Sequence, residues 1–400
     1  MALLDNRQLL EEKDILLSDY SEITPDPQGP LFFWLGNASL LVYNVVINAI
    51  DIYTHLSHRK SIGNDLARAY NFPCSLVALI LCFIKIRNQK ILFIISLLVL
   101  FFDLLAFPLL IIIPMSENAV YWGTIAAITV SGIFSSIIMS GSFAISTQFA
   151  DETAGFISAG NGLCGILAAV ARIITKGLFS SESQLKISST VYFAFSALTI
   201  LGTLIFFILK LRNPDISSRF IFNSYQKENS AFSSQILTTL KSIWLLWFAE
   251  ALSYFITLII FPGYVCSVQE GPLKSWTPVL ITTVFCIFDF IGRFVASKFI
   301  WPSLNMSPLA SIFRIIFIPL EIISIQKIFN FREPWFTLGL QIPFALTNGY
   351  VGTILMIYGS NHPDLDSEKK KLAGYLMTFA INVGIIIAMF STFILPKPSV

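Results

Sequence analysis

Long apolar stretches, separated by short polar ones, follow one another along most of the chain. A membrane-spanning helix needs roughly 20 predominantly apolar residues at about 1.5 Å each. The pattern predicts an all-α polytopic membrane protein with eleven transmembrane helices, of which the second is short and should run on to Lys85. The eleven stretches are Leu31–Ile50, Phe72–Ile84, Ile91–Met115, Ala119–Gln148, Ala154–Ala171, Ile187–Leu209, Ile243–Pro262, Trp276–Ser297, Pro308–Ile325, Pro334–Tyr358 and Leu372–Leu395.

Composition narrows the class of protein further. Hydrophobic residues make up 55% of the chain and charged residues 12%, which is typical of membrane proteins. The five cysteines and three histidines show no metal-ligand spacing, and the chain has no Ser/His/Asp order or phosphate-binding glycine loop. We therefore expect neither an enzyme nor a bound cofactor or metal.

The longest polar connection divides the apolar stretches into six and five. We expect four parts: a cytosolic acidic tail (1–30), an N-terminal bundle of helices one to six (31–211), a cytosolic hinge loop (212–237) and a C-terminal bundle of helices seven to eleven (238–400). Loop lysines and arginines show a modest excess on the cytosolic side when the N-terminus is placed there. Two bundles that rock about a site at the membrane midplane are the architecture of a secondary transporter.

Two opposite charges lie inside the eighth apolar stretch. Asp289 and Arg293 are four residues apart, so they share one face of a helix. A charge at the bilayer centre costs about 2.5–3.5 kcal/mol on insertion scales, and such residues are retained where they face a partner or a wet cavity. The pair can neutralise itself and pin the bundle, or it can line a substrate pathway with one acceptor and one donor group.

Motifs spread along the chain resemble those of one transporter family, in the family's order. The stretch FCIFDFIGR (Phe285–Arg293) resembles the eighth-helix signature of equilibrative nucleoside transporters. Five further stretches are similar to motifs of the fifth, seventh, ninth, tenth and eleventh helices: Asn161–Thr175, Phe261–Val265, Phe313–Leu320, Phe344–Tyr358 and Ala373–Gly384.

The resemblance implies a 6+5 fold related to the major facilitator architecture, with the N-terminus in the cytosol and the C-terminus outside. It also implies equilibrative transport of nucleosides by alternating access, with purine nucleosides as expected substrates and nucleobases as further candidates. Two alternatives stay open: a proton-coupled symporter of nucleosides or nucleobases, and a major-facilitator-type carrier of another small solute. The loop Lys85–Lys90 weakens the second alternative, because it lacks that superfamily's glycine-x-x-x-aspartate-arginine motif.

The resemblance also suggests a substrate site. The pair in the eighth helix matches the family pair that engages the ribose, and the aromatic residues suit a purine, which offers a flat face and polar edges. Cys286 stands where the family has asparagine, and Asn161 where it has glutamine, so the base preference stays open. Seven residues are expected in the site: Asp289, Arg293, Phe261, Tyr43, Asn44, Ile47 and Cys286.

Small and amide residues in the fifth, eighth and tenth helices have a different expected role. Small residues allow helix backbones to approach closely in a membrane. We expect five residues to serve helix packing and transport motion: Gly160, Gly162, Gly165, Gly292 and Asn348.

Carboxylates inside the apolar stretches are candidate proton carriers. Glu250 lies in the middle of the seventh stretch, and Asp51 follows the first. Both are candidates for proton coupling, although Asp51 is better explained as a residue at the membrane interface. Arg314 of the ninth stretch is expected to snorkel or to pair with another residue.

The N-terminal tail carries one indication of location. DNRQLL and EKDILL fit the acidic dileucine pattern that sorting adaptors bind, at Leu9–Leu10 and Leu16–Leu17; an amphipathic segment with chance leucine pairs is the alternative. We expect the plasma membrane, with a vacuolar or endolysosomal membrane as the alternative. The expected partners are the substrate and lipid, without nucleic acid, and the expected functional unit is a monomer.

Overall fold

The computed structural model describes residues 28–59, 62–84, 86–179, 184–221, 229–265, 277–326, 334–391 and 395. Regular structure within these residues is helical, apart from one isolated bridge between Asn88 and Ile221. Eleven of the described helical spans are long and apolar enough to cross a membrane. The prediction of eleven spans is confirmed, and the protein is a multi-pass membrane protein.

The helices fall into two sets along the chain. The first set is α2 (Gly29–Asn48), α3 (Ile50–Ser57), α4 (Ile62–Phe83), α5 (Gln89–Ile112), α6 (Glu117–Ser146), α7 (Thr153–Leu178), α8 (Leu185–Lys210) and the short α9 (Pro214–Arg219). The second set is α10 (Asn229–Ile260), α11 (Thr277–Ala296), α12 (Ser307–Phe313), the 3-10 turn η4 (Arg314–Ile316), α13 (Phe317–Ile325), α14 (Pro334–Ser360) and α15 (Ser367–Ser391).

Several helices continue beyond their apolar stretches. α4 begins at Ile62 rather than at Phe72, and α10 begins at Asn229 rather than at Ile243. A helix satisfies its own backbone hydrogen bonds whether or not its side chains are apolar, so it need not end where hydropathy falls. The segment 212–237, predicted as a hinge loop, accordingly contains α9 and the first turns of α10.

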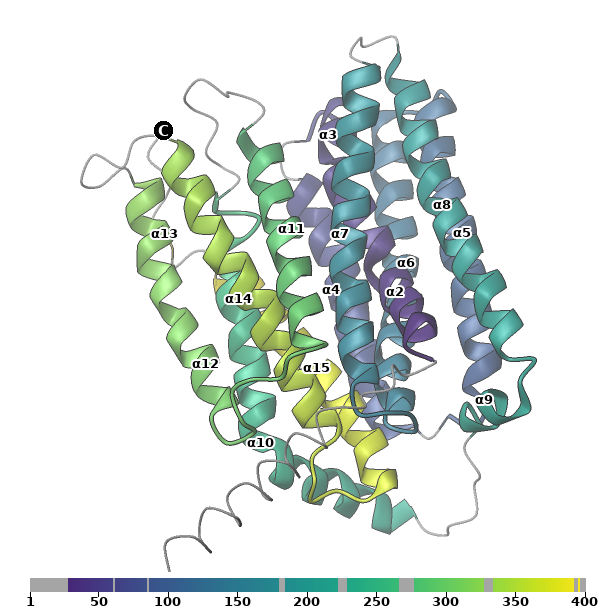
Figure 1. Ribbon diagram of the computed structural model, residues 1–400. Coiled ribbons are helices and arrows are strands. Elements are labelled where there is room, and N and C mark those ends of the chain that lie inside the picture. Colours follow the sequence, from purple (N-terminus) through teal and green to yellow (C-terminus); the bar gives the residue numbers. More distant parts are fainter. Residues whose placement is uncertain are drawn as a thin grey trace, which may run out of the picture.

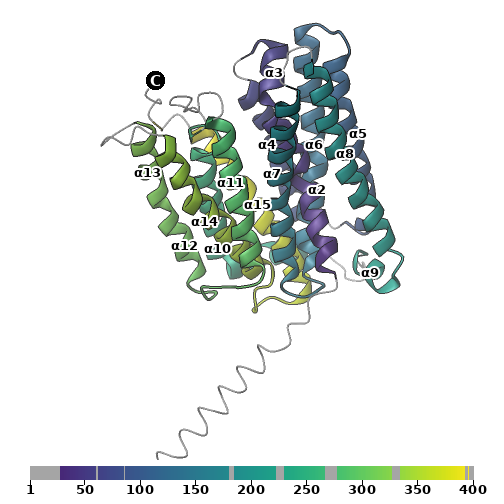
Figure 2. The ribbon, with the colours of Figure 1, turned by 45° about the horizontal axis from the view of Figure 1, so that its top comes forward.

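The two sets form two bundles that stand side by side (Figures 1 and 2). In the first bundle α2 packs on α7, α4 on α6 and α5 on α8, and in the second α11 packs on α14 and α10 on α15. The bundles meet where α7 lies against α11 and where α15 lies against α4 and α6. We call the end near α9 the lower end and the end near α3 the upper end, as they stand in Figure 1.

The outward surface of the bundles is apolar. Phe102, Trp122, Leu198 and Phe313 each expose more than half of their surface. A soluble protein seldom exposes apolar area on this scale, whereas lipid chains cover such side chains without cost. The exposed residues therefore mark the faces that contact the bilayer.

Contacts between the bundles close the lower end. Gln89 Nε2, at the start of α5, donates a hydrogen bond of 2.6 Å to the hydroxyl of Tyr375 on α15. Asn361 Nδ2 donates to the backbone carbonyl of Asp151 at 3.0 Å. This closed end is the one that the sequence predicts to face the cytosol.

Candidate functional site

A cavity of about 570 Å³ lies between the two bundles. Helices α2, α4 and α7 form one wall, and α10, α11, α14 and α15 form the other. The lining reaches Asn48 of α2, Lys176 of α7 and Val279 of α11, all near the upper ends of their helices. Because the lower end is closed, the cavity faces the upper side, which is the side predicted to be extracellular.

The cavity brings together the residues that the resemblance placed in a substrate site. These residues come from α2 in the first bundle and, in the second, from α11 and the residue that follows α10. All seven line the cavity: Tyr43, Asn44, Ile47, Phe261, Cys286, Asp289 and Arg293.

An ion pair lies toward the closed end of the cavity. Arg293 Nε donates to Asp289 Oδ2 at 2.7 Å, across one turn of α11. A second guanidinium nitrogen lies 3.4 Å from Asp289 Oδ1 and 3.5 Å from the hydroxyl of Tyr254. Each residue of the pair is 7% exposed. A nearly buried pair that still borders a cavity keeps its charges together while leaving hydrogen-bonding capacity for a ligand.

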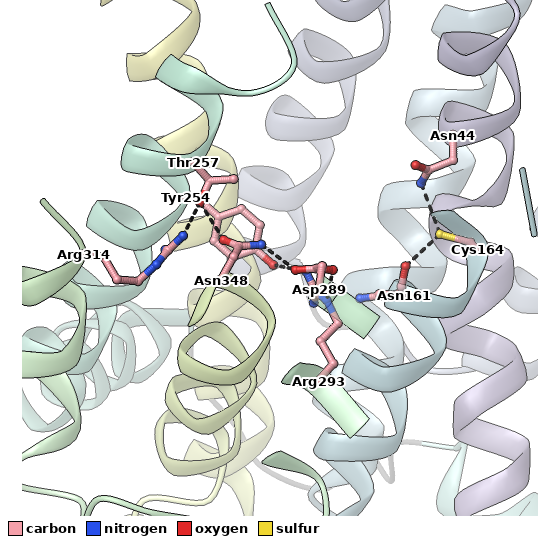
Figure 3. A network of polar contacts seen from close by, with 9 residues as sticks. All are labelled: Asn44, Asn161, Cys164, Tyr254, Thr257, Asp289, Arg293, Arg314 and Asn348. Atoms are coloured by element: carbon pink, nitrogen blue, oxygen red, sulfur yellow. Dashed lines mark hydrogen bonds and ion pairs between the residues drawn. The ribbon is translucent and has the colours of Figure 1, made fainter. Parts of the chain in front are cut away.

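Asn348 of α14 completes the surroundings of the carboxylate (Figure 3). Its Nδ2 donates to Asp289 Oδ1 at 2.6 Å, and it lines the cavity. The sequence predicted Asn348 as a packing residue, and the structure places it in contact with the predicted ligand-binding carboxylate. Its Oδ1 accepts from the hydroxyl of Thr257 at 2.6 Å.

Two residues of α10 were not among the sequence-based candidates. Tyr254 and Thr257 both line the cavity, seven and four residues before Phe261. Residues at this spacing share one face of a helix. Both residues could have been found in the sequence, because they lie four and seven residues before Phe261, at helical spacing.

Aromatic rings stand on both sides of the cavity. Phe261, directly after α10, is stacked on Phe285 of α11, with ring centroids 3.9 Å apart and planes inclined by 9°. In the opposite bundle, Tyr43 of α2 lies 4.6 Å from the ring of Tyr70 on α4. All four residues line the cavity, so a flat ligand would meet aromatic surface from either bundle.

A smaller polar group lies on the wall formed by the first bundle. Asn44 Nδ2 lies 3.1 Å from Cys164 Sγ and 3.1 Å from the carbonyl oxygen of Leu40. On α7, Asn161 Oδ1 accepts from the hydroxyl of Ser39 at 3.0 Å. These contacts tie α2 to α7 and fix the orientation of the two amides that border the cavity.

The glycines predicted to serve packing lie on three different seams between helices. Gly160 lies against α2 at the backbone of Phe33, and Gly292 lies against α14 at the backbone of Leu346. Gly162 and Gly165 face α11: a Cβ at Gly162 would lie 2.9 Å from Arg293 Cδ, and one at Gly165 would lie 3.0 Å from Cys286 Sγ. The last two glycines therefore border the seam between the bundles.

The two carboxylates considered for proton coupling have different positions. Glu250 of α10 is fully buried, and neither of its carboxylate oxygens has a hydrogen-bond partner. It does not line the cavity. Asp51 belongs to α3, but its side chain lies outside the described residues.

No group of three or more His, Cys, Asp or Glu side chains that could hold a metal ion occurs in the described part of the chain. The polar residues that border the cavity carry amides and hydroxyls, the Cys286 thiol, the Asp289–Arg293 ion pair and the basic groups of Arg172 and Lys176. This set recognises a ligand through hydrogen bonds.

Solved structures with a similar fold are known. A solved structure of the major facilitator superfamily proton:xylose symporter XylE, bound to 6-bromo-6-deoxy-D-glucose, matches with a TM-score of 0.64 and 10% sequence identity. The match covers 91% of this chain and 87% of the symporter. The chain therefore has a fold like that of the major facilitator transporters, in the predicted 6+5 arrangement.

Sequence comparison finds relatives among nucleoside transporters. The family model described as nucleoside transporter matches residues 210–395. Equilibrative nucleotide transporter 8 of Arabidopsis thaliana is 24% identical over 377 residues, covering 89% of this chain and 92% of the relative. Equilibrative nucleoside transporter 1 of Homo sapiens is 24% identical over 440 residues, covering 90% and 95%. The chain is thus similar to equilibrative nucleoside and nucleotide transporters over most of its length.

Proposed function

We propose that the protein carries nucleosides across its membrane by alternating access, as a uniporter. The observation that carries this proposal is the Asp289–Arg293 pair, placed toward the closed end of a cavity between two bundles. A carboxylate accepts hydrogen bonds from ribose hydroxyls, and a guanidinium donates to ribose or base oxygens. The names of the matching family model and of the human relative support the same substrate class.

The aromatic residues support a preference for purine nucleosides. Phe261 and Tyr43 belong to opposite bundles, and each is backed by a second ring. A bicyclic base offers both walls a larger flat surface than a pyrimidine does. Free nucleobases share that surface but lack the hydroxyls that would engage Asp289, so they are expected to be weaker substrates.

Transport would proceed by opening the upper and lower ends of the cavity in turn. A nucleoside enters from the upper side, contacts both bundles and is released when the upper side closes and the lower side opens. Opening the lower side requires the contacts of Gln89 with Tyr375, and of Asn361 with Asp151, to separate. Since one chain supplies both walls, a monomer is sufficient.

A proton-coupled symporter is the second candidate, and Glu250 is the observation that favours it. Its buried carboxylate has no hydrogen-bond partner, and the charges that act on it are the guanidinium groups of Arg293 and Arg314, with Tyr254 also nearby. A carboxylate in this position could bind a proton in one conformation and release it in another.

Purified protein in liposomes tests both proposals. Uptake of radiolabelled adenosine, inosine and hypoxanthine is measured with and without an imposed pH gradient, against protein-free liposomes. Saturable nucleoside uptake that ignores the gradient is expected for the uniporter. Uptake driven by an inward proton gradient, and made insensitive to it by Glu250→Gln, would establish symport instead. Absence of uptake for all three solutes would overturn the nucleoside assignment.

The plasma membrane is the proposed location, with a vacuolar or endolysosomal membrane as the alternative. The dileucine pairs at Leu9–Leu10 and Leu16–Leu17 lie outside the described residues. Imaging a fluorescently tagged protein before and after Leu9→Ala/Leu10→Ala and Leu16→Ala/Leu17→Ala decides the matter. Movement from an internal membrane to the cell surface in either variant would identify that pair as a sorting signal.

A further inference from the structure

We propose that Arg314, which does not line the cavity, positions the carboxylate of Asp289 through a chain of hydrogen bonds. The chain passes through Thr257 and Asn348 (Figure 3). The inference rests on the proposed function, because it assigns Arg314 a part in holding the group that receives the nucleoside's hydroxyls.

Arg314 is a buried cation whose hydrogen-bond partners are all neutral. It lies in η4, the 3-10 turn between α12 and α13, and is among the largest fully buried side chains. Its NH1 donates to the carbonyl of Ser253 at 2.9 Å and also to the Ser253 hydroxyl, and its NH2 donates to Thr257 Oγ1 at 2.8 Å. No described carboxylate forms an ion pair with it. Burying a guanidinium in this way is costly, so a role beyond packing is expected.

The direction of each hydrogen bond follows from the number of protons available. Thr257 has one hydroxyl proton and accepts from Arg314, so that proton is free for Asn348 Oδ1 at 2.6 Å or for the carbonyl of Ser253 at 3.0 Å. Ser253 already accepts from Arg314. Arg314 therefore favours donation from Thr257 to Asn348.

Donation from Thr257 fixes which end of the Asn348 amide faces Asp289. With Oδ1 held by Thr257, Nδ2 points to Asp289 Oδ1 and donates at 2.6 Å. If Thr257 turned its proton to Ser253, the amide could rotate and present its oxygen to the carboxylate. Two oxygens without a proton between them repel each other, and the carboxylate would turn away.

The consequence for a ligand is a carboxylate held at both oxygens. Asn348 binds Oδ1 and Arg293 binds Oδ2, so only the remaining lone pairs can accept from a substrate. Two neighbouring hydroxyls require a carboxylate plane of fixed orientation, whereas a ligand without hydroxyls does not. Breaking the chain should therefore penalise ribosides more than their dideoxy analogues.

A double-mutant cycle tests the chain. Arg314→Gln, Thr257→Val and the double variant are reconstituted in liposomes, and KM and kcat are measured for adenosine and 2′,3′-dideoxyadenosine. Each single variant should raise the adenosine KM by roughly tenfold, with a smaller change in kcat and in the analogue. The double variant should lose no more selectivity than the more severe single variant, because both changes interrupt one chain.

Two further variants separate this effect from general damage. Thr257→Ser keeps the hydroxyl and should retain most of the wild-type selectivity. Thr353→Val makes the same change as Thr257→Val at another buried threonine, on α14, which neither lines the cavity nor belongs to the chain; its selectivity should equal that of the wild type. If Arg314→Gln does not fold, the comparison of Thr257→Val with Thr257→Ser decides the proposal.

The outcomes distinguish this inference from the proposed function. A wild-type protein that does not transport adenosine overturns both. A wild-type protein that transports adenosine, with additive losses in the cycle or with equal losses for the riboside and its dideoxy analogue, overturns the role of Arg314 alone. Equal selectivity of Thr257→Val and Thr257→Ser for adenosine over its dideoxy analogue would also overturn the role of Arg314 alone.

Discussion

Gly349 of α14 lies directly against the backbone carbonyl oxygen of Asp289 on α11, closer than any side chain would allow. A Cβ at Gly349 would also come within 3.0 Å of Arg293 Cγ. The close approach of α14 and α11 at this point therefore helps to determine where the ion pair stands.

Gly349→Ala is expected to separate the two helices and displace the pair. Overpacking of this kind costs about 1–3 kcal/mol of folding stability. Uptake per folded protein should fall strongly, because the displaced pair is the one proposed to bind the substrate. Thermal unfolding in detergent measures the loss of folding stability, and uptake measures the loss of transport. Gly339→Ala in the same helix is the matched control, since no atom lies within 4 Å of its would-be Cβ. Equal behaviour of the two variants would contradict the argument.

Asp289→Asn should reduce transport of ribosides more than transport of free bases. The amide has nearly the same shape but no charge, and it accepts hydrogen bonds through one oxygen only. Loss of a charged hydrogen bond predicts a rise in KM for inosine of roughly ten- to a hundredfold, with a smaller rise for hypoxanthine. Competition of each unlabelled ligand against labelled adenosine measures both values.

The matched control is Asp103→Asn on α5. That carboxylate accepts from the hydroxyl of Ser131 and does not line the cavity, so the ratio of inosine to hypoxanthine transport should not change. If Asp289→Asn lowered transport of both ligands equally, the pair would serve the structure of the bundle alone.

Cys286 reports which side of the membrane the cavity faces. Its thiol lines a cavity that faces the upper side, so a membrane-impermeant methanethiosulfonate reagent added from that side should modify it and inhibit uptake. Saturating adenosine should slow the reaction by occupying the same space. Cys286→Ser should remove the inhibition, and inhibition that persisted in this variant would place the reactive thiol elsewhere.

Tyr375→Phe is expected to weaken the closure of the lower end. The change removes the hydroxyl that accepts from Gln89 Nε2 across the two bundles, and a neutral hydrogen bond contributes about 0.5–1.5 kcal/mol. The population should shift toward the inward-facing state, and labelling of Cys286 from the upper side should slow. Tyr192→Phe is the control, because its hydroxyl donates to the carbonyl of Val45 within the first bundle. A similar slowing in both variants would point to a general loss of stability.

Much of the fold could be predicted from the sequence, because every membrane-spanning helix needs an apolar stretch of about 20 residues, which hydropathy detects. Helix ends could not, as α4 shows: its first turns carry Asn64, Asp65 and Arg68, which lower the average hydropathy without ending the helix. The break at η4 was also missed. Its residues Arg314–Ile316 include no proline or glycine, and the position of the break becomes evident only when the partners of Arg314 are known.

The candidate site likewise contains some residues that could be predicted from the sequence and others that could not. Asp289 and Arg293 could be proposed from a four-residue spacing in an apolar stretch, since an isolated charge there requires a partner. The contact of Asn348 with Asp289 could not, because it joins α14 to α11 and no periodicity relates two helices. Thr257 was missed because an intramembrane threonine usually donates to the carbonyl four residues earlier. That carbonyl, of Ser253, is within reach at 3.0 Å, but Asn348 Oδ1 is closer, at 2.6 Å.

The position of Gly162 against Arg293 Cδ has a mechanical consequence. The aliphatic part of Arg293, a predicted ligand-binding residue, also forms part of the packing contact between the two bundles. A nucleoside that alters how Arg293 is held acts on that contact directly, without a relay of intermediate residues. Ligand binding and the relative motion of the bundles would then be coupled at one contact. The occupied and the empty carrier would differ in the energy barrier to that motion.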